Sequence, residues 1–546
     1  MEILAVRDLT FTYPQCSSPA VKNVSFELQR GELAVLCGAT GSGKSTLLRL
    51  LKRELAPLGD KQGSVLFNGK ELSELDSITS ASAVGFVMQR TEQQIVTDKV
   101  WHELAFGLEN LGTPPHEISR RIAEMASYFG IGSWYDRDVS ELSGGQKQLL
   151  NLASVLVMQP EILILDEPTA QLDPIAAADF IATLKRLCCD FSITIIIAEH
   201  RLEDVVPICD KLLVMENGSL IAADEPRSVI SELNSRPDIL CGMPAASRLH
   251  AKLSGSGSCP LTVREGRSFI ESSYRNTTRG LPQAARCSSD AAAMEFSSIY
   301  FRYSRDSKDI LDGLSIKIYE REIFCILGGN GSGKTTALSV GAGLLKPYSG
   351  SIRVFGKKLK DYKNRSLYRE CLAMLPQDVQ TVFLRNTVRE ELDECGAVLS
   401  ELPFDLSPLL DKHPYDLSGG QQQLTALAKV LAAKPKLLLL DEPTKGLDAA
   451  AKQGIISVIR SLKERGVTVA IVTHDVEFAA VCADRCAMFF GGRIVSDGVP
   501  NEFFSRNSFY TTAVSRMTRG HFDNAVTLSD AAELCRINGR KELPCS

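Results

Sequence analysis

Apolar runs, glycine-rich turns and polar strand ends follow one another along this chain in a fixed order. Residues 1–32 alternate apolar and polar positions in short runs, which is typical of a small antiparallel sheet. The unbroken apolar runs Leu33–Cys37, Ile162–Leu165 and Thr194–Ala198 predict strands that are buried on both faces. Apolar residues at helical spacing in Gln148–Val157, just before the second of these runs, predict a helix, so buried strands and helices alternate. The pattern predicts a fold of the α/β class.

A helical insertion interrupts this alternation between residues 90 and 140. The segments Val100–Leu108 and Ile118–Phe129 carry apolar residues at helical spacing. We therefore expect a helical subdomain beside the buried strands.

The loop that follows the first buried strand carries the clearest chemical signal. Its sequence, Gly38-Ala39-Thr40-Gly41-Ser42-Gly43-Lys44-Ser45, fits the phosphate-binding pattern G-x-x-x-x-G-K-[ST]. Glycines let the backbone wrap a phosphate, and the first amides of the next helix, around Thr46, point at the anion. We expect Lys44 to reach the β- and γ-phosphates of a nucleotide and the Ser45 hydroxyl to hold Mg²⁺.

Two other buried strands end on polar residues that suit hydrolysis. Asp166 and Glu167 directly follow the run Ile162–Leu165, and a further buried strand ends at His200. Carboxylates at a buried strand end are costly to desolvate unless a metal ion or a reacting water engages them. Asp166 is the natural Mg²⁺ partner, and Glu167 is the natural base toward water.

Three further features are candidates for nucleotide contacts. Tyr13, at the end of the first strand, is placed to stack on an adenine ring. An apolar strand stops at Gln89, and a glutamine at such an edge can reach both a Mg²⁺ site and a neighbouring domain. In Ser143-Gly144-Gly145-Gln146 the serine is expected to cap the next helix, and the glycines leave backbone N–H groups open to an anion.

The whole series occurs a second time in the same order. A second phosphate loop, Gly328-Gly329-Asn330-Gly331-Ser332-Gly333-Lys334-Thr335, again follows an apolar run. The other positions recur as Tyr303, Gln377, Ser418, Asp441, Glu442, Asp448 and His474. The glutamine and the serine are 54 positions apart in the first copy and 41 in the second, so the helical insertion is shorter there. We expect matching nucleotide cores with different partner surfaces.

Composition narrows the classes of partner. The chain has 546 residues, 44% of them hydrophobic, and its net charge of −5 gives no electrostatic case for nucleic acid as the main partner. Its 15 cysteines show no zinc or disulfide spacing, so we expect reduced thiols. The first residues do not resemble a signal peptide, and no apolar run approaches the roughly 20 residues that span a bilayer. At a membrane, a partner would have to hold the protein.

The boundaries follow from a change in composition near residue 245. From there to about residue 293 the chain turns to serine, glycine, arginine and small residues, which is typical of a flexible linker. We predict a first domain, a flexible linker, a second domain and a C-terminal tail at residues 1–240, 241–293, 294–520 and 521–546.

The ordered motifs resemble the ATP-binding subunits of ATP-binding cassette (ABC) transporters, with two cassettes in one chain. The resemblance rests on Walker A, the Q-loop glutamine, the LSGGQ signature, Walker B with its glutamate, the D-loop and the H-loop histidine, each present twice. It implies two tandem P-loop NTPase domains, each with a RecA-like core, an antiparallel β subdomain and a helical subdomain. It also implies ATP and Mg²⁺ as ligands, and head-to-tail pairing of the two cassettes within the chain.

Carried onto this chain, the resemblance implies two composite ATP sites. One would use Tyr13, Lys44, Ser45, Gln89, Asp166, Glu167 and His200 with Ser418, Gly419 and Gly420. The other would use Tyr303, Lys334, Thr335, Gln377, Asp441, Glu442 and His474 with Ser143, Gly144 and Gly145. Further implied nucleotide contacts are Gly38, Gly41, Gly43, Thr46, Gln146, Asp173, Gly328, Gly331, Gly333, Thr336, Gln421 and Asp448.

Within these sites the resemblance assigns roles. Glu167, His200, Glu442 and His474 would be catalytic, and Ser45, Gln89, Asp166, Thr335, Gln377 and Asp441 would hold Mg²⁺. Both glutamates and both histidines are present, so two hydrolytic sites are expected. The D-loop begins with Gln171 in the first copy and with Gly446 in the second, which argues against equal rates at the two sites.

A narrower resemblance points to the energy-coupling factor (cobalt/vitamin) ATPases. It rests on Phe11–Pro14, Gln93–Val96, Glu103–Gly112 and Glu199–Asp204. It implies a peripheral subunit on the cytoplasmic face of the cell membrane that powers import of a vitamin, a vitamin precursor or a metal ion. Its partners would be a transmembrane coupling protein and a small substrate-binding membrane protein. Fused-cassette members are often assigned to hydroxymethylpyrimidine or thiamine uptake.

Three other functions are consistent with the same motifs. A twin-cassette sugar importer is the nearest, although its halves usually differ more in their catalytic motifs. A soluble twin-cassette factor of the ribosome usually carries a long charged helical linker, which is missing here, and a basic footprint, which the net charge of −5 does not provide. A nucleotide-binding scaffold with little turnover is disfavoured because all the catalytic positions are filled.

Overall fold

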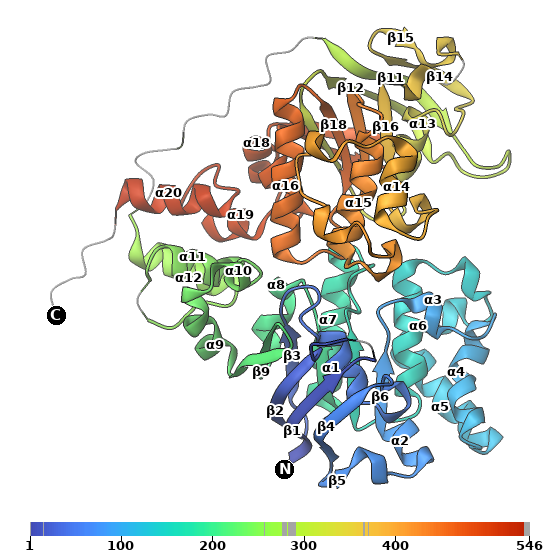
Figure 1. Ribbon diagram of the computed structural model, residues 1–546, viewed down its shortest axis with the longest axis vertical. Coiled ribbons are helices and arrows are strands. Elements are labelled where there is room, and N and C mark those ends of the chain that lie inside the picture. The colour runs from blue at the N-terminus through green and yellow to red at the C-terminus, as the bar shows by residue number, and fades with distance from the viewer. Residues whose placement is uncertain are drawn as a thin grey trace. The chain divides into compact units, whose positions relative to one another are not determined.

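The computed structural model of the chain describes residues 2–14, 16–255, 257–275, 281, 291–363, 366–369 and 371–539 (Figure 1). The chain divides into two units, Met1–Pro244 and Ala245–Ser546. Each unit contains one six-stranded sheet and one four-stranded sheet. The predicted α/β cassette is therefore present twice.

The six-stranded sheet of the first unit has the order β10-β9-β3-β8-β7-β6, and the four-stranded sheet has the order β2-β1-β4-β5. In the larger sheet the strands from β9 to β6 are parallel, and β10 pairs antiparallel with β9. The smaller sheet is antiparallel throughout, as the alternating residues 1–32 predicted. The strands are β1 Glu2–Thr12, β2 Val21–Gln29, β3 Leu33–Cys37, β4 Asp60–Phe67, β5 Lys70–Glu71, β6 Val84–Val87, β7 Ile162–Asp166, β8 Thr194–Ala198, β9 Lys211–Glu216 and β10 Ser219–Asp224.

The helices of the first unit form two groups. Helix α1 lies between the two sheets, because Leu47, Leu48 and Leu50 share one apolar core with strands of both. Helices α4, α5 and α6 build a separate core, which is the predicted helical subdomain. The helices are α1 Lys44–Leu50, α2 Ser77–Ala83, α3 Thr91–Gln94, α4 Val100–Asn110, α5 Pro115–Tyr128, α6 Gly144–Leu156, α7 Pro174–Phe191, α8 Leu202–Val205, α9 Pro226–Glu232 and α10 Pro237–Leu240.

The second unit repeats this plan, with sheet orders β16-β17-β18-β13-β19-β20 and β12-β11-β14-β15. Its strands are β11 Ala292–Phe301, β12 Leu311–Tyr319, β13 Ile323–Leu327, β14 Ser349–Val354, β15 Lys357–Lys358, β16 Leu372–Leu375, β17 Leu437–Asp441, β18 Thr468–Thr473, β19 Arg485–Phe490 and β20 Arg493–Gly498. Its helices are α11 Ala245–Lys252, α12 Val263–Ser273, α13 Lys334–Gly341, α14 Val388–Cys395, α15 Gly419–Leu431, α16 Ala449–Glu464, α17 Val476–Cys482, α18 Pro500–Arg506, α19 Ala513–Thr518 and α20 Leu528–Asn538.

Buried strands of the larger sheet in the second unit contribute to two cores, which explains their unbroken apolar sequence. In β13, Phe324 and Ile326 face the core that contains α13 and the antiparallel sheet. The alternate residues Ile323, Cys325 and Leu327 face the core that contains α16. Successive side chains of a strand point to opposite faces, so both sets must be apolar.

The helical subdomain differs between the units, as the shorter spacing predicted. The first unit has α4 and the 14-residue α5 before α6. In the second unit the eight-residue α14 is followed by short 3₁₀ turns, among them Leu399–Glu401 and Ser407–Leu409, before α15 begins. The surfaces beside the two nucleotide cores are therefore not equivalent.

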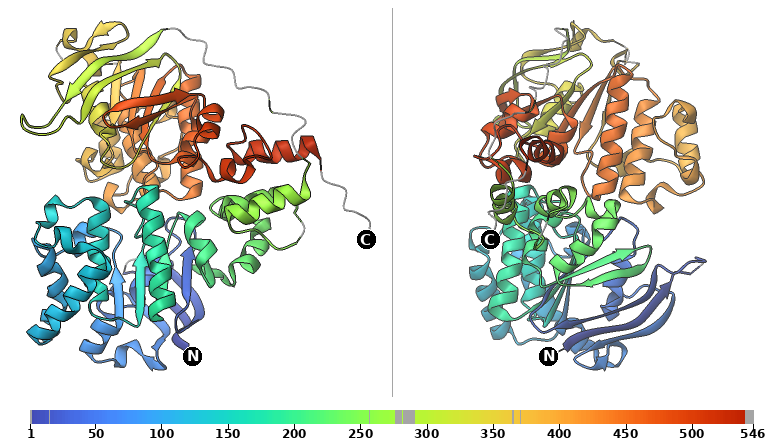
Figure 2. Two further views of the ribbon diagram at one scale, coloured as in Figure 1. Left: turned by 180° about the vertical axis from the view of Figure 1, so that it is seen from behind. Right: turned by 90° about the vertical axis from the view of Figure 1, so that its left-hand side faces the viewer.

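The prediction of a flexible linker is wrong for the described residues from 245 to 275. Helices α11 and α12 form there and pack beside α19 and α20 (Figures 1 and 2). The apolar side chains of Ala245, Leu249 and Leu253 are spaced as on one face of a helix. Their packing partners come from the far end of the chain, so the local serine- and glycine-rich composition was misleading. Residues 276–280 and 282–290 of the predicted linker lie outside the described residues.

This group of four helices includes much of the predicted C-terminal tail. Leu534 and Cys535 of α20 are fully buried in it, together with Ile270 of α12. The group is joined to the cassette through Glu477 at the start of α17, whose carboxylate accepts a hydrogen bond of 2.7 Å from the Ala513 backbone N–H at the start of α19. We call α11, α12, α19 and α20 the helical module of the second unit.

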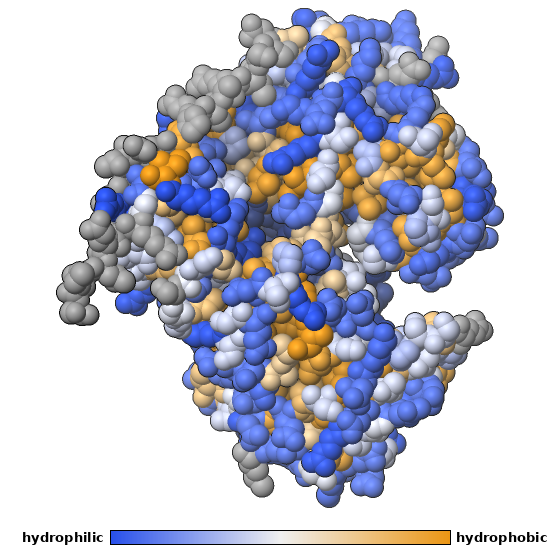
Figure 3. Space-filling view, turned by 60° about the vertical axis from the view of Figure 1, so that its left-hand side comes forward, coloured by the Kyte–Doolittle hydropathy of each residue, from blue (hydrophilic) through white to orange (hydrophobic). Residues whose placement is uncertain are grey.

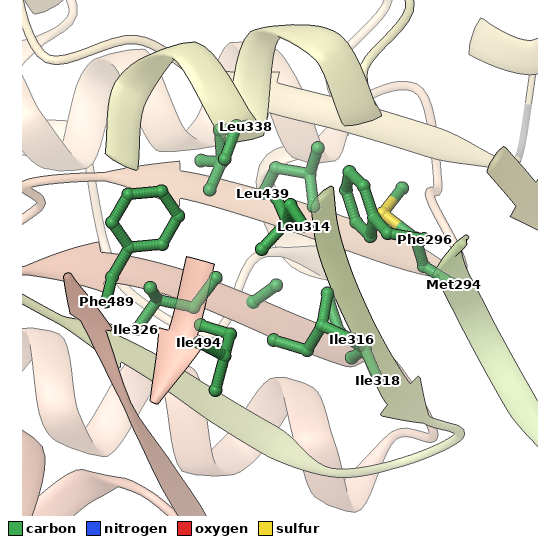
Figure 4. Close-up of a pocket in the computed structure, with 12 residues that line it drawn as sticks. Met294, Phe296, Leu314, Ile316, Ile318, Ile326, Leu338, Leu439, Phe489 and Ile494 are labelled. Atoms are coloured by element: carbon green, nitrogen blue, oxygen red, sulfur yellow. The ribbon is translucent and has the colours of Figure 1, made fainter. Parts of the chain in front are cut away.

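The core of the second unit contains a small cavity between its two sheets (Figure 4). Apolar side chains line it, among them Phe296, Leu338 and Phe489. Water in such a space would gain no hydrogen bonds, so the cavity is a packing gap and not a polar ligand site.

Hydrophobic side chains on the face drawn in Figure 3 gather in separate areas between hydrophilic ones. Within the part of the chain that the structure describes, no helix combines the length and the apolar character that crossing a membrane requires.

The helical module should contribute measurably to the stability of the second unit. Leu534→Ala removes a fully buried side chain from its core, and we expect the free energy of unfolding of this unit to fall by about 2–5 kcal/mol. Denaturant unfolding followed by hydrogen exchange of the second unit measures the change. The matched control is Arg536→Ala, an exposed position of the same helix, and an equal loss in both variants would contradict a packed module.

Candidate active site

The chemically active residues of each cassette meet at the carboxyl ends of parallel strands. In the first cassette the phosphate loop follows β3, Gln89 follows β6, Asp166 ends β7, and His200 follows β8. The order β3-β8-β7-β6 makes these strand ends neighbours at one edge of the sheet. The second cassette repeats the arrangement with β13, β18, β17 and β16.

The backbone of the phosphate loop requires glycine at two positions. Gly38 has φ +145°, and a Cβ added there would lie 2.1 Å from the Met215 carbonyl oxygen. Gly43 has φ +99°, and its Cβ would lie 2.3 Å from the Ala20 carbonyl oxygen. No side chain fits at either position, so the loop keeps its backbone amides uncovered.

The loop lysines are buried and already face the loop interior. Lys44 Nζ donates hydrogen bonds to the carbonyl oxygens of Gly38 at 2.9 Å and Ala39 at 3.0 Å. Lys334 does the same with Gly328 and Gly329, both at 2.9 Å.

Two buried hydroxyls in the loops lack a hydrogen-bond partner. Ser42 Oγ and Ser332 Oγ are buried, and neither bonds to any residue that the structure describes. A buried donor without a partner, next to a lysine and open amides, is the environment expected where an anion binds.

The hydroxyl after each loop lysine touches the aspartate at the end of the neighbouring strand. Ser45 Oγ donates to Asp166 Oδ1 at 3.0 Å, and Thr335 Oγ1 donates to Asp441 Oδ1 at 3.1 Å. Burial and the adjacent Glu167 charge raise the pKa of Asp166. Burial also raises the pKa of Asp441 to about 6. A cation at this point would remove the penalty on each charged form.

These oxygen donors fit Mg²⁺ but do not form a complete cage. No group of three or more His, Cys, Asp or Glu side chains that could hold a metal occurs in the described part of the chain. Mg²⁺ is commonly bound by one or two protein oxygens together with substrate phosphates. The pairs Ser45–Asp166 and Thr335–Asp441 suit that mode, with the nucleotide supplying the rest.

The two glutamates have the same backbone but different side-chain partners. Glu167 has φ +46° and Glu442 has φ +49°, the left-handed region that a side chain rarely adopts. Such strain is typical of functional sites. Glu167 Oε1 lies 2.9 Å from His200 Nε2, and Glu167 Oε2 accepts a hydrogen bond of 2.6 Å from the Gln89 amide.

In the second cassette the glutamate contacts its histidine and the residue before it. Glu442 Oε1 lies 2.9 Å from His474 Nδ1, and Glu442 Oε2 accepts from the Thr473 hydroxyl at 3.2 Å. Among the described residues, Gln377 makes no hydrogen bond to Glu442. The structure thus brings glutamate and histidine together in both cassettes, and among the described residues the glutamine bonds to the glutamate only in the first.

The two tyrosines occupy equivalent places beside the loops. Tyr13 OH lies 3.0 Å from Thr46 Oγ1, and Tyr303 OH lies 3.0 Å from Thr336 Oγ1. The Tyr303 side chain is 66% exposed, so its face is open to a flat ligand such as an adenine ring.

The signature residues lie on a separate element, the amino end of a helix in the helical subdomain. Ser143 and Gln146 form a capping box at the start of α6, and Ser418 and Gln421 do the same at the start of α15. Apart from the capped N–H groups of Gln146 and Gln421, the N–H groups in the first turn of each helix, which contains Gly144–Gly145 or Gly419–Gly420, have no partner within the helix.

The D-loop aspartates act as helix caps next to the signature of the same cassette. Asp173 accepts from the Ala176 N–H at 2.9 Å, and Asp448 accepts from the Ala451 N–H at 2.7 Å. A Cβ added at Gly145 would lie 3.9 Å from Leu172 Cδ2, which is ordinary van der Waals contact. Leu172 of the D-loop therefore lies next to the signature of the first cassette.

Comparison of the two copies could not single out Glu199, because it has no acidic counterpart. Glu199 precedes His200 and is 2% exposed, and the second copy has Thr473 at this place. The sequence did contain one signal for Glu199. It is a carboxylate directly after the apolar strand β8, where an ionised group needs hydrogen-bond partners.

Comparison with known proteins agrees with this geometry. The sequence profile of the family described as ABC transporter matches residues 21–170 and 311–445. A relative from Bacillus thuringiensis subsp. konkukian, provisionally named an ABC transporter ATP-binding protein, is 39% identical over 545 residues, which cover 97% of this chain and 98% of the relative. A relative from Bacillus subtilis, provisionally named HMP/thiamine import ATP-binding protein YkoD, is 32% identical over 521 residues, 93% of each chain.

Among solved structures, cbiO1 from Clostridium perfringens is similar to part of the chain. It is described as part of the ABC transporter complex cbiONQ, and it shares 32% sequence identity with a TM-score of 0.39 over 43% of this chain and 95% of its own. The family profile matches both cassettes, and relatives align over nearly the full length. The chain belongs to the ABC transporter ATP-binding proteins, and it is a two-cassette ATPase subunit of a transporter.

Proposed function

We propose that this ATPase powers an importer of the energy-coupling factor type for a vitamin, a vitamin precursor or a metal ion. The observation that carries the proposal is the complete set of hydrolytic groups in both cassettes, with Glu167 next to His200 and Glu442 next to His474 at 2.9 Å. Import is supported by the Bacillus subtilis relative, whose name refers to HMP/thiamine import. The motif Glu199–Asp204 supports the narrower type.

Each site would be completed by the other cassette. In the proposed arrangement the amides that open at Ser143–Gly145 and Ser418–Gly420 contact the nucleotide held by the opposite phosphate loop. Lys44 and Lys334 would exchange their loop carbonyl partners for phosphate oxygens. Mg²⁺, when bound, would neutralise phosphate charge between the hydroxyl and the aspartate.

Hydrolysis would depend on the two buried glutamates. Glu167 and Glu442 would orient the attacking water and accept its proton, and the adjacent His200 and His474 would hold each carboxylate in place. Burial acts to raise the pKa of Glu442, but the hydrogen bonds and attraction from His474, together with the charge of Lys334, outweigh it, so this pKa lies below its usual value. The carboxylate is therefore ionised and able to accept a proton at neutral pH.

The segment after each Q-loop glutamine is the proposed contact with the membrane partner. In the first cassette the buried Glu103 accepts hydrogen bonds from the N–H groups of Val96 at 3.1 Å and Thr97 at 2.8 Å. Glu391 holds Leu384 and Arg385 in the same way. The apolar side chains of Val96 and Leu384 are 65% and 76% exposed on these fixed segments. A rigid backbone with an outward apolar side chain suits docking of a partner helix.

The proposed partners are a transmembrane coupling protein and a small substrate-binding membrane protein, with the ATPase held peripherally on the cytoplasmic face. The partners would supply the substrate path, because the site residues described in both cassettes suit ATP. Movement of the docked segments with Gln89 and Gln377 would transmit closing and reopening of the cassettes to the partner.

Removal of both carboxylates should stop turnover and leave nucleotide binding. In the double variant Glu167→Gln with Glu442→Gln we expect the ATPase rate to fall by about 10²–10⁴-fold, because the general base is lost. Binding of a fluorescent ATP analogue should change little. The matched control is Glu124→Gln with Glu464→Gln, which changes two exposed glutamates, and retained turnover in the first variant would reject the assignment.

The docking segments should select the partner. Affinity purification of the tagged chain from its own cells in mild detergent, followed by mass spectrometry, should recover a polytopic membrane protein together with a small hydrophobic one. Val96→Asp with Leu384→Asp should abolish this recovery and leave the basal ATPase rate within about twofold, since neither side chain lies in the active site.

The control for this experiment replaces two exposed apolar residues elsewhere, Leu58→Asp with Val495→Asp, which are 87% and 54% exposed. It should retain the membrane proteins. Recovery of ribosomal proteins without any membrane protein would reject the importer and support the ribosomal alternative.

A further inference from the structure

A buried carboxylate that the proposed chemistry does not use lies beneath the D-loop of the first cassette. Glu199 Oε1 accepts hydrogen bonds from the Thr169 backbone N–H at 2.9 Å and from the Thr169 hydroxyl at 2.6 Å. Glu199 Oε2 accepts from the His200 backbone N–H at 3.1 Å. One side chain therefore holds both Thr169, two residues before the D-loop, and the backbone of the histidine that contacts Glu167.

The placement of Glu199 is demanding, which argues against an incidental role. The side chain is 2% exposed, and burial raises the pKa of its carboxyl. A carboxylate in such a place is tolerated when donors satisfy its oxygens, and three donors do so here. All three come from the two loops that flank the strained Glu167 backbone.

The Thr169 end of this contact controls the turn that contains Glu167. The Glu167 carbonyl accepts from the Ala170 N–H at 3.2 Å, and the Thr169 carbonyl accepts from the Leu172 N–H at 3.0 Å. The segment from Glu167 into the D-loop is thus a series of tight turns with Thr169 at its centre. Moving Thr169 would move the backbone of Glu167 at φ +46°.

The D-loop also reaches the signature. Arg201 Nη1 donates to the Leu172 carbonyl at 3.0 Å, and a Cβ at Gly145 would lie 3.9 Å from the Leu172 side chain. Leu172 therefore lies next to the signature, and hydrogen bonds join Leu172 to Thr169, Thr169 to Glu199, and Glu199 to His200, which contacts Glu167. In the proposed function the signature serves one ATP and Glu167 serves the other.

The second cassette connects the same elements differently. Thr473, at the place of Glu199, donates its hydroxyl to Glu442 Oε2 at 3.2 Å and accepts from the Asp475 N–H at 3.0 Å. Asp475, at the place of Arg201, pairs with Lys452 at 2.6 Å. In the second cassette the residue before the histidine, Thr473, therefore holds the glutamate itself. In the first cassette the equivalent residue, Glu199, holds Thr169 at the entry to the D-loop.

We infer that Glu199 is a positioning residue for hydrolysis in the first cassette, which makes that site depend on the placement of its D-loop. This inference rests on the proposed hydrolytic role of Glu167. Without Glu199, Glu167 and His200 would lose the contact that ties them to the D-loop, and the glutamate would orient water poorly. The second cassette, held by Thr473, would not be affected.

The test measures each cassette separately in the full chain. An azido-ATP analogue is hydrolysed, trapped with vanadate and cross-linked by light, and the labelled peptides are assigned to the first or second cassette by mass spectrometry. The variants are Glu199→Thr, which introduces the residue of the other cassette, and Glu199→Gln, which keeps an acceptor for Thr169. Steady-state kcat and KM for ATP and thermal unfolding accompany each variant.

For Glu199→Thr we expect trapping in the first cassette to fall by about 10²-fold, since small displacements near a reacting group have effects of this size. Trapping in the second cassette and KM should stay within about twofold. Glu199→Gln should lie between this variant and the wild type, because one of its two polar atoms still accepts from Thr169.

A second pair of variants keeps the inference testable if the Glu199 variants do not fold. Thr169→Val removes the 2.6 Å hydrogen bond from the other side and should also lower trapping in the first cassette selectively. Its control, Thr183→Val, removes a buried hydroxyl that donates to the Asp179 carbonyl at 2.8 Å on helix α7, and should leave both cassettes unchanged.

Equal loss in both cassettes, or no loss in the first, would overturn the inference. The Glu167→Gln with Glu442→Gln variant is run in parallel to separate this result from failure of the proposed function. If that variant still traps nucleotide, the hydrolytic assignment fails. If it does not trap and the Glu199 and Thr169 variants behave like wild type, only the positioning role fails.

Discussion

Placing two carboxylates at the end of a strand buried on both faces is the constraint on which each cassette depends. Asp166 and Asp441 end such strands, and burial raises the pKa of both. The hydroxyl that follows each loop lysine offsets part of this cost of burying a charge. It donates a hydrogen bond to the aspartate, at 3.0 Å for Asp166 and 3.1 Å for Asp441. The parallel sheet, the glycine loop and the neighbouring histidine strand are all needed to form this environment.

The two cassettes share this environment but connect it differently to their surroundings. Glu167 bonds to the Q-loop through Gln89, and the residue before His200 holds the D-loop. Glu442 bonds to Thr473 instead, while each glutamate contacts the histidine of its own cassette. The helical subdomains differ too, since α5 has no counterpart of similar length before α15. The two cassettes therefore combine equivalent chemistry with non-equivalent surfaces beside it.

The helical module of the second unit illustrates how a linker becomes part of a domain. Helices α11 and α12 alone would leave one apolar face exposed, and α20 alone would do the same. Together with α19 they bury Leu249, Ile270 and Leu534 in one core. The ends of the second unit are therefore joined, although the whole cassette lies between them in sequence.

The sequence by itself determined the α/β class, the repeat, and most side chains that meet in each site, because strand-end motifs depend on local order along the chain. It also predicted the shorter second insertion from the spacing of Gln377 and Ser418. Only the tertiary structure decided the helices within residues 245–275, since their packing partners lie more than 200 residues away. It also decided the partners of Glu167 and Glu199, because hydrogen bonds between strand ends depend on side-chain geometry that no spacing records.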